Sequence, residues 1–280
     1  FPAPFPARIE HQYAERRHQR QPREVERARY PGHARGHGQR KAPFQRIYAH
    51  TEVEQGGHRH RRVMFHVPEE QLHNPSGQDD DKDEDAAVII DLGGDDFYSN
   101  NAGASTEKIG CAILIDLGGD DAYESTGDGA QGTGVLGVGI LADMAGNDSY
   151  VGMRWCQGAC ALGVGIVLDA RGDDSYRAHA YAQGSALWGT AIAIDAGGND
   201  RYESHMLSQG VGMPYGIGVL TDLAGNDSYY SKGAYPSCYG TPGIYEAWSQ
   251  GVGAGFRKYA SGGIGILLDA GGKDRYEAGN

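Results

Sequence analysis

Short aliphatic runs recur along residues 86–280, and each of them ends on an aspartate. The residue three positions before that aspartate is always β-branched, as at Val88, Ile113 and Ile140. Short β-branched runs bounded by glycine and aspartate are typical of strands. Because apolar residues occupy successive positions in these runs, we expect strands that are buried on both faces.

The aspartate that ends each run opens a motif with the skeleton Asp-x-x-Gly-x-Asp-x-Tyr, which occurs seven times. Successive motifs lie 25, 27, 26, 26, 27 and 47 residues apart. A fixed period in this range predicts a repeat architecture. The first aspartates are Asp91, Asp116, Asp143, Asp169, Asp195, Asp222 and Asp269. The second aspartates are Asp96, Asp121, Asp148, Asp174, Asp200, Asp227 and Asp274. The tyrosines are Tyr98, Tyr123, Tyr150, Tyr176, Tyr202, Tyr229 and Tyr276.

The second half of most repeats carries a Gln-Gly pair, at Gln131, Gln157, Gln183, Gln209 and Gln250. One strand, one Asp-Gly turn and one return strand per repeat match one coil of a solenoid. We therefore predict an all-β fold, a parallel β-solenoid of seven repeats of about 26 residues, preceded by a long extended N-terminal arm. Equivalent residues of adjacent coils then lie about 4.8 Å apart. We expect the tyrosine rings to stack and the glutamine amides to hydrogen-bond to one another along the stack.

Composition and charge divide the chain into three parts. Residues 1–78 are rich in Arg, His, Gln and Pro and show no sustained periodicity, which is typical of an extended arm. Residues 79–85, DDDKDED, form an acidic hinge, and residues 86–280 hold the solenoid, with a loop insertion at about 231–262. Residues 1–70 carry a net charge of +6 and residues 71–280 a net charge of −18.

Several classes of function find no support in the sequence. The chain contains no nucleophile elbow, His-Glu-x-x-His motif, P-loop or dinucleotide fingerprint. The carboxylates recur in every repeat, whereas a catalytic pair would appear once, so we expect no enzyme. The basic arm lacks a recognisable nucleic-acid-binding module and adjoins an acidic body, so we expect no nucleic acid as partner. The longest apolar runs are four or five residues, too short to span a membrane.

The two aspartate columns are the candidate site. Unit charges about 4.8 Å apart repel each other by roughly 1 kcal/mol in water and by more near a protein surface. Carboxylates and turn carbonyls are ligands suited to Ca²⁺, so all fourteen aspartates of the motifs are candidate calcium ligands. Alternatively, each first aspartate caps its own turn as an Asx-turn. Both can hold together, and we favour calcium because capping leaves the second column charged. Four cations close to that column, Arg171, Arg201, Lys273 and Arg275, could neutralise part of it.

The segment Gly-x-Asp-x-Tyr, as in GNDSY at 146–150 and GNDRY at 198–202, resembles the RTX nonapeptide Gly-Gly-x-Gly-x-Asp-x-apolar-x of calcium-binding β-rolls. The likeness covers about nine residues in each repeat. The resemblance implies a secreted, calcium-stabilised parallel β-structure.

We therefore expect a non-enzymatic structural protein, extracellular or at the cell surface, which is stabilised by Ca²⁺ and assembles with itself. The first repeat begins directly after the acidic hinge and the last lacks its Gln-Gly half, which predicts open ends that join head to tail into filaments. The basic arm would act as a tether to the acidic body. One alternative is an adhesion module that binds a ligand such as a cell-surface polysaccharide through the sixth-repeat loops, at Tyr235, Tyr239, Tyr245 and Trp248. A β-helical enzyme acting on polysaccharides is the second alternative.

Overall fold

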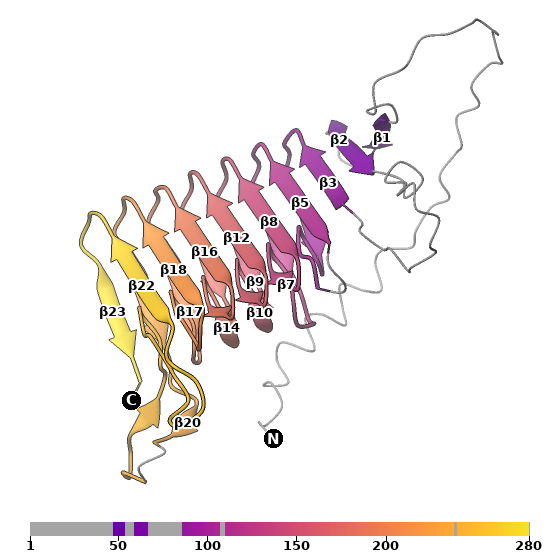
Figure 1. Cartoon of the computed structure of the whole chain (residues 1–280). Helices are drawn as coiled ribbons and strands as arrows, with labels where there is room; N and C mark the ends of the chain where they lie inside the picture. The colour runs from indigo at the N-terminus through magenta and orange to yellow at the C-terminus, as the bar shows by residue number, and fades with distance from the viewer. Residues whose placement is uncertain (1–46, 54–58, 67–85, 107–109, 238–239, 280) are drawn as a thin grey trace, which may run out of the picture. The chain divides into compact units, whose positions relative to one another are not determined.

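The computed structural model describes residues 86–106, 110–237 and 240–279 in full, and residues 47–53 and 59–66 as backbone strands. All of these residues belong to one compact unit, residues 43–280. The described residues form strands and turns, and the strands stack as the coils of a parallel β-solenoid (Figure 1). Seven repeats make about six turns, so the predicted fold class is confirmed. Among these residues, no helix has the length and apolarity that crossing a membrane requires.

The first sheet of the solenoid contains the aliphatic runs. Each run forms one strand and ends on its first aspartate, and neighbouring strands pair in parallel with first aspartate opposite first aspartate. The strands are β3 (Ala86–Asp91), β5 (Cys111–Asp116), β8 (Val138–Asp143), β12 (Val164–Asp169), β16 (Thr190–Asp195), β18 (Ile217–Asp222) and β22 (Ile264–Asp269).

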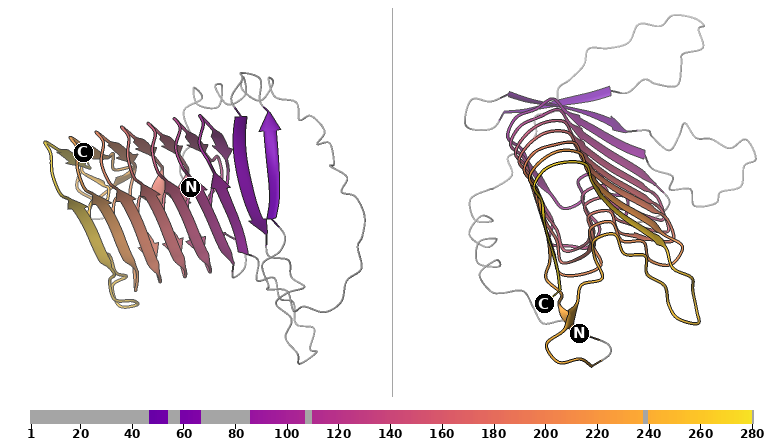
Figure 2. Two further views of the ribbon diagram at one scale, coloured as in Figure 1. Left: turned by 90° about the horizontal axis from the view of Figure 1, so that it is seen from above. Right: turned by 90° about the vertical axis from the view of Figure 1, so that its left-hand side faces the viewer.

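The second sheet begins after the Asp-Gly turn and carries the tyrosines. Its strands pair in parallel with tyrosine opposite tyrosine. They are β4 (Phe97–Ser99), β6 (Ala122–Glu124), β9 (Ser149–Val151), β13 (Ser175–Arg177), β17 (Arg201–Ser204), β19 (Ser228–Ser231) and β23 (Arg275–Ala278). The coils overlie one another when they are viewed along the solenoid axis (Figure 2).

Shorter strands complete the coils on the Gln-Gly side. A three-stranded sheet joins β7 (Gly134–Val135), β11 (Cys160–Ala161) and β15 (Ala186–Leu187), and a second pair joins β10 (Arg154–Cys156) and β14 (Ala180–Ala182). In the sixth repeat, β20 (Tyr235–Pro236) and β21 (Tyr245–Glu246) form an antiparallel pair within the loop insertion.

The core between the two sheets is built around the tyrosine column. Six successive pairs of rings stack with centroids 4.6 to 4.9 Å apart and with planes within 7° of parallel, which confirms the predicted ladder. The rings pack against aliphatic side chains from the first sheet, among them Leu114, Leu141 and Leu220. Stacked aromatic pairs contribute about 0.5–1.5 kcal/mol each beyond the burial of their area. The ring spacing matches the distance of about 4.8 Å between paired strands, so the stack adds to the stability that the two sheets give the coils.

Two glycines of most repeats allow neighbouring coils to approach. At Gly172, in the Asp-Gly turn, a Cβ atom would lie 1.5 Å from the carbonyl oxygen of Gly146 in the preceding coil. At Gly158, after Gln157, φ is +71° and a Cβ atom would lie 2.6 Å from the carbonyl oxygen of Ile192. A side chain at either position would separate the coils, which explains the regular spacing of glycine along the chain.

The expectation that the first-sheet strands are buried on both faces is wrong. Along β12 the side chains alternate between half-buried and buried, and β8 and β16 show the same alternation. The inward positions face the tyrosines, whereas the outward positions are shielded only by their neighbours along the sheet. Figure 1 shows this outer face turned toward the viewer, with no described strand across it.

Two strands also lie within the segment that was expected to be an arm without periodicity. β1 (Ile47–Val53) and β2 (Arg59–His66) pair antiparallel, and β2 pairs antiparallel with β3. β2 therefore takes up the free backbone groups of β3, whereas β4, in the same coil, remains the edge strand of the second sheet. The pair Gly56-Gly57 between two β-prone runs is the hairpin signal in the sequence. The rest of the arm and the acidic hinge, residues 79–85, lie outside the described residues.

Candidate metal centre

The first aspartates cap the turns that follow their strands. In every repeat one carboxylate oxygen, Oδ1, accepts a hydrogen bond from the backbone N–H two residues further on, at 3.0 to 3.4 Å. This geometry is the Asx-turn that the sequence offered as an alternative. From Asp91 to Asp222 these side chains are at most 1% exposed, so the cap is also a buried carboxylate.

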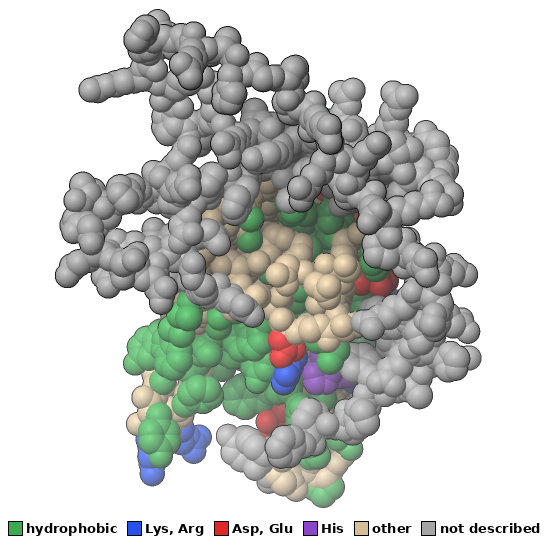
Figure 3. Space-filling model, turned by 90° about the vertical axis from the view of Figure 1, so that its right-hand side faces the viewer, with side chains coloured by type: hydrophobic (Ala, Val, Ile, Leu, Met, Phe, Trp, Pro, Cys, Tyr) green, Lys and Arg blue, Asp and Glu red, His purple; other side chains and the backbone are tan. Residues whose placement is uncertain are grey.

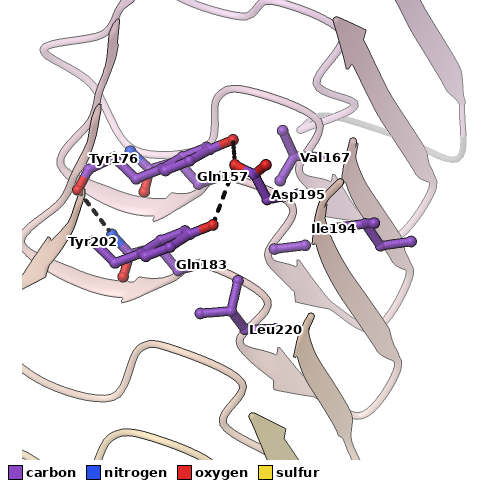
Figure 4. A pocket seen from close by; sticks show the side chains of 9 residues that line it. Gln157, Val167, Tyr176, Gln183, Ile194, Asp195, Tyr202 and Leu220 are labelled. Atoms are coloured by element: carbon purple, nitrogen blue, oxygen red, sulfur yellow. Dashed lines mark hydrogen bonds between the residues drawn. The ribbon is translucent and has the colours of Figure 1, made fainter. Parts of the chain in front are cut away.

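The other oxygen of the first aspartate, Oδ2, accepts a hydrogen bond from a tyrosine hydroxyl. Tyr150 donates to Asp169 at 2.6 Å. Tyr176 and Tyr202 both donate to Asp195, at 2.9 and 3.2 Å (Figure 4). Burial raises the pKa of these tyrosines well above its usual range, so the hydroxyls remain protonated donors. The sequence analysis missed this role, although the tyrosine recurs at a constant seven residues from the first aspartate.

The second aspartates form a ladder of their own. The backbone N–H of each donates to Oδ1 of the second aspartate in the next coil, at 2.6 to 3.1 Å from Asp121 onward. The other oxygen, Oδ2, is buried and receives no hydrogen bond from the described residues. This holds for five successive coils, at Asp121, Asp148, Asp174, Asp200 and Asp227. Each of these side chains is about 2% exposed.

First and second aspartates come together in groups of three between adjacent turns. Asp148, Asp169 and Asp174 each offer a carboxylate oxygen, and these atoms lie within 4.8 Å of one another. Asp174, Asp195 and Asp200 form the next group, and further groups recur along the solenoid. Twelve of the fourteen candidate aspartates belong to the groups Asp91–Asp96–Asp116, Asp116–Asp121–Asp143, Asp148–Asp169–Asp174, Asp174–Asp195–Asp200 and Asp200–Asp222–Asp227. The other two candidates, Asp269 and Asp274, lie half-buried in the last coil.

Burial disfavours the charged form of these carboxyl groups. It raises the pKa of Asp174 to about 10 and those of Asp148 and Asp200 to about 9, and neighbouring carboxylates add to the effect. The pKa of Asp169 rises less, to about 7, because the hydroxyl of Tyr150 stabilises its charge. A protonated Asp200 can donate to Asp195, and that hydrogen bond lowers the pKa of Asp195. The column of second aspartates therefore needs either bound protons or a cation to neutralise its buried charge.

The remaining charged and amide residues of the turn do not complete the column. Asp120, Asn147 and Asp173 are exposed and form a separate ladder, in which the backbone N–H of one coil donates to the side-chain oxygen of the previous coil at 2.9 to 3.0 Å. Arg201 and Arg275, expected as partial counter-charges, pair instead with Glu203 and Glu277 on the outer face of the second sheet. Arg171 and Lys273 are exposed on the turn. The bare oxygens of the second aspartates therefore receive no cation from Arg201 or Arg275.

The glutamine column differs from the expectation. The amide Nε2 of Gln157 donates to the carbonyl oxygens of Tyr150 and Arg177, at 3.0 and 3.1 Å, and so bridges its own coil and the next. Gln131, Gln183, Gln209 and Gln250 repeat this arrangement. The amides thus bond to backbone carbonyls rather than to one another. Each glutamine has a left-handed backbone, with φ of 53° to 66°, which turns its amide toward the second sheet.

Comparison of the sequence and the structure with family models, with curated proteins and with solved structures finds no match. The parallel solenoid with stacked, aspartate-rich turns agrees with a β-roll-like repeat fold, and no family model assigns the chain to the RTX family.

Proposed function

We propose that the chain is a non-enzymatic, extracellular structural protein whose solenoid is stabilised by calcium ions bound between neighbouring Asp-Gly turns. The observation that carries the proposal is the column of buried Oδ2 atoms at Asp121, Asp148, Asp174, Asp200 and Asp227, which receive no hydrogen bond from the described residues. A buried charge that is neither paired nor coordinated costs several kcal/mol. A cation in the column would remove that cost in each coil.

The donor set favours a hard cation. Each group of three offers carboxylate oxygens only, and Ca²⁺ takes six to eight oxygen ligands at about 2.3–2.6 Å. Zinc and copper prefer imidazole or thiolate ligands, and the groups contain none. Asp148, Asp169 and Asp174 would hold one ion, with turn carbonyls or water completing its coordination. Extracellular calcium modules bind at about 10⁻⁴–10⁻³ M, a range that suits a secreted protein.

The repetition supports a structural role. The same carboxylates and tyrosine recur in all seven repeats, whereas a catalytic pair would appear once. One space close to the column is lined by Tyr176, Asp195 and Tyr202 and lies within the packed core, where the hydroxyls meet the carboxylate (Figure 4). An ion between two turns would tie one coil to the next, and the bound ions together would stabilise the whole rod by mass action.

Calorimetry of the intact chain tests the proposal. We expect the melting temperature to rise with added Ca²⁺ and to fall in excess EGTA, and isothermal titration to give several ions per chain. Magnesium at the same concentration is the control, because its smaller, octahedral shell fits rigid carboxylate groups less well. Identical melting in calcium and in EGTA would rule the proposal out and leave the protonated column as the native state.

An adhesive role is the second candidate, and one observation favours it. Tyr235, Tyr245 and Trp248 in the loop insertion are 39%, 41% and 42% exposed, and aromatic rings of this kind stack on sugars and on partner side chains. Tyr239, also expected in this contact area, lies outside the described residues. A glycan array would detect binding. Tyr245→Ser should then abolish it, whereas Tyr215→Ser, at an exposed tyrosine outside the insertion, should not.

Self-association is part of the structural proposal, and the head-to-tail route stays a prediction. Because β2 pairs with β3, a head-to-tail contact through the first sheet would form at β1, its edge strand, rather than at β3. The tether role proposed for the basic arm concerns residues that mostly lie outside the described part of the chain. The surface considered next is independent of both.

A further inference from the structure

The outer face of the first sheet is aliphatic along its whole length. It is formed by the residues five, three and one positions before each first aspartate and by the residue after it, and we call it the aliphatic face. Its rows are Ala86, Val88, Ile90 and Leu92; Cys111, Ile113, Ile115 and Leu117; Val138, Ile140, Ala142 and Met144; Val164, Ile166, Leu168 and Ala170; Thr190, Ile192, Ile194 and Ala196; Ile217, Val219, Thr221 and Leu223; and Ile264, Ile266, Leu268 and Ala270. None of these residues is charged.

The aliphatic face is accessible to solvent. The geometry of the coils does not require the outer face of a sheet to be aliphatic. Its central side chains, such as Ile166, are half-buried by their neighbours, whereas Leu117, Ile217 and Leu268 toward the rim and the last coil are 42% to 51% exposed. The outer face of the second sheet belongs to the same coils, yet it carries ion pairs such as Arg177–Glu203, at 3.0 Å. Hydrophobic side chains also gather on one flank of the described body in Figure 3. The aliphatic face is therefore a property of the sequence at these positions.

The size of the aliphatic face matches that of an interface between proteins. Seven rungs about 4.8 Å apart and seven residues along each strand at about 3.3 Å give a face of roughly 29 by 20 Å, or about 580 Å². This is at the upper end of the apolar patches found on monomers, and patches of that size are often functional. Two such faces would bury about 1,160 Å² in total, above the roughly 1,000 Å² expected of a biological interface.

We infer that two copies of the chain pack face to face through the aliphatic face. Two flat sheets with the same spacing of rungs are complementary to each other, and sheets pack about 10 Å apart with their strands roughly aligned. A two-fold axis through the contact closes the pair, so the product is a dimer. This inference deepens the proposed structural role by naming the surface through which copies associate, and it does not require calcium.

Other occupants fit the aliphatic face less well. A polysaccharide needs hydrogen-bonding groups, and the face offers only the hydroxyls of Thr190 and Thr221 and the thiol of Cys111. An anionic membrane needs Lys or Arg around the contact, and residues 71–280 carry a net charge of −18. The same negative charge opposes the approach of two copies, so the dimer should strengthen as salt screens the repulsion.

Sedimentation velocity of the intact chain tests the inference. We expect a dimer, and we expect Ile166→Lys to halve the mass, because a charge would be buried at the centre of the contact. Ile166→Thr with Ile192→Thr is the milder variant, which keeps β-branched residues in the strands and should weaken the dimer without loss of fold. Val151→Lys, on the outer face of the second sheet, is the matched control and should leave the dimer intact.

The outcomes separate this inference from the calcium proposal. A dimer that persists in EGTA supports the contact whatever the fate of calcium, and a monomer whose melting responds to calcium overturns the contact and leaves calcium standing. A folded Ile166→Lys variant that remains dimeric also overturns it, with circular dichroism as the check of fold. A monomer that floats with phosphatidylcholine vesicles would assign the aliphatic face to a membrane surface instead.

Discussion

Two buried ladders run along this solenoid, and they differ in one property. The glutamine ladder and the ladder of second aspartates both recur in successive coils, both link neighbouring coils through one polar atom, and both leave an oxygen bare in the described structure, Oε1 in Gln157 and Oδ2 in Asp174. The amide is neutral at every pH, whereas the carboxyl group is an acid. The glutamine ladder thus carries no charge that has to be neutralised, whereas the aspartate ladder depends on the solution for a proton or a cation.

The two ladders also serve opposite halves of the backbone. Glutamine donates to carbonyl oxygens of the second sheet, while the second aspartate accepts from N–H groups at the Asp-Gly turn. A neutral acceptor would have sufficed for the second role. That an acid occupies this position in every repeat is the reason to look for a cation there.

The largest expected effect comes from pH in the absence of calcium, because it acts on every coil. The pKa values of Asp148, Asp174 and Asp200 are about 9, 10 and 9 in the folded chain, against about 3.9 in an unfolded one. The folded state therefore binds more protons than the unfolded state between these values, and stability falls as pH rises through that window. In EGTA the chain should melt at a higher temperature at pH 5 than at pH 8, and calcium should flatten this dependence. A calcium-free chain that is more stable at pH 8 would contradict the raised pKa values.

Removal of one amide from the glutamine ladder should cost less. Gln157→Leu removes two hydrogen bonds, to the carbonyl oxygens of Tyr150 and Arg177, while the carbonyl of Arg177 keeps its bond from the N–H of Gly152. Leucine adopts the same left-handed backbone at Leu162 and Leu207, so the main chain need not change. Since each hydrogen bond contributes a net of about 0.5–1.5 kcal/mol, urea denaturation should show a loss of about 1–3 kcal/mol, independent of calcium. Gln250→Leu, at a half-buried position, should lose less.

One substitution in the ladder of second aspartates should have opposite effects on stability in the absence and in the presence of calcium. Asp174→Asn keeps an oxygen that accepts from the N–H of Asp148 and removes the charge. In EGTA at neutral pH the variant should be at least as stable as the parent chain. In calcium it should lose about 1.5–3 kcal/mol of the stabilisation, because Asp174 belongs to two groups of three and each ion at about tenfold its Kd contributes roughly 1.4 kcal/mol. Denaturation of the variant and of the parent chain, each in calcium and in EGTA, gives the comparison. Equal stability of variant and parent in both conditions would separate the ladder from calcium.

Another expected effect concerns the tyrosine that supports the first aspartate. Tyr150→Phe removes the donor to Asp169, and a hydrogen bond to a charged group contributes about 1.5–3 kcal/mol when the partner is ionised and about half of that when it is neutral. Tyr229→Phe is the control, because the hydroxyl of Tyr229 has no hydrogen-bond partner among the described residues. Thermal melting should show a shift for the first variant and little for the second. Equal shifts would mean that the hydroxyl of Tyr150 contributes only through packing.

Most of the fold could be predicted from the sequence, because a parallel stack of coils transmits its period directly. Equivalent residues must lie opposite one another when every coil has the same length, so Tyr150 and Tyr176 had to stack and Asp143 and Asp169 had to end neighbouring strands. The Asx-turns also follow from the local sequence, since the carboxylate of Asp169 reaches an N–H only two residues away. Repeat period and local turn chemistry were sufficient for these features.

The rest depended on where the coils bring side chains together. In each aliphatic run both faces are apolar, so the pattern could not indicate that Ile166 lies on the outer face and Val167 in the core. The hydroxyl of Tyr150 reaches Asp169, nineteen residues away along the chain, and the amide of Gln157 reaches the backbone of the next coil, contacts that depend on the path of the bends. β2 pairs with β3 although its sequence is basic, because an open strand edge gains hydrogen bonds from any extended segment. The period determined which residues are equivalent, and only the tertiary structure decided which polar groups meet, because those contacts join parts of the chain that no local pattern relates.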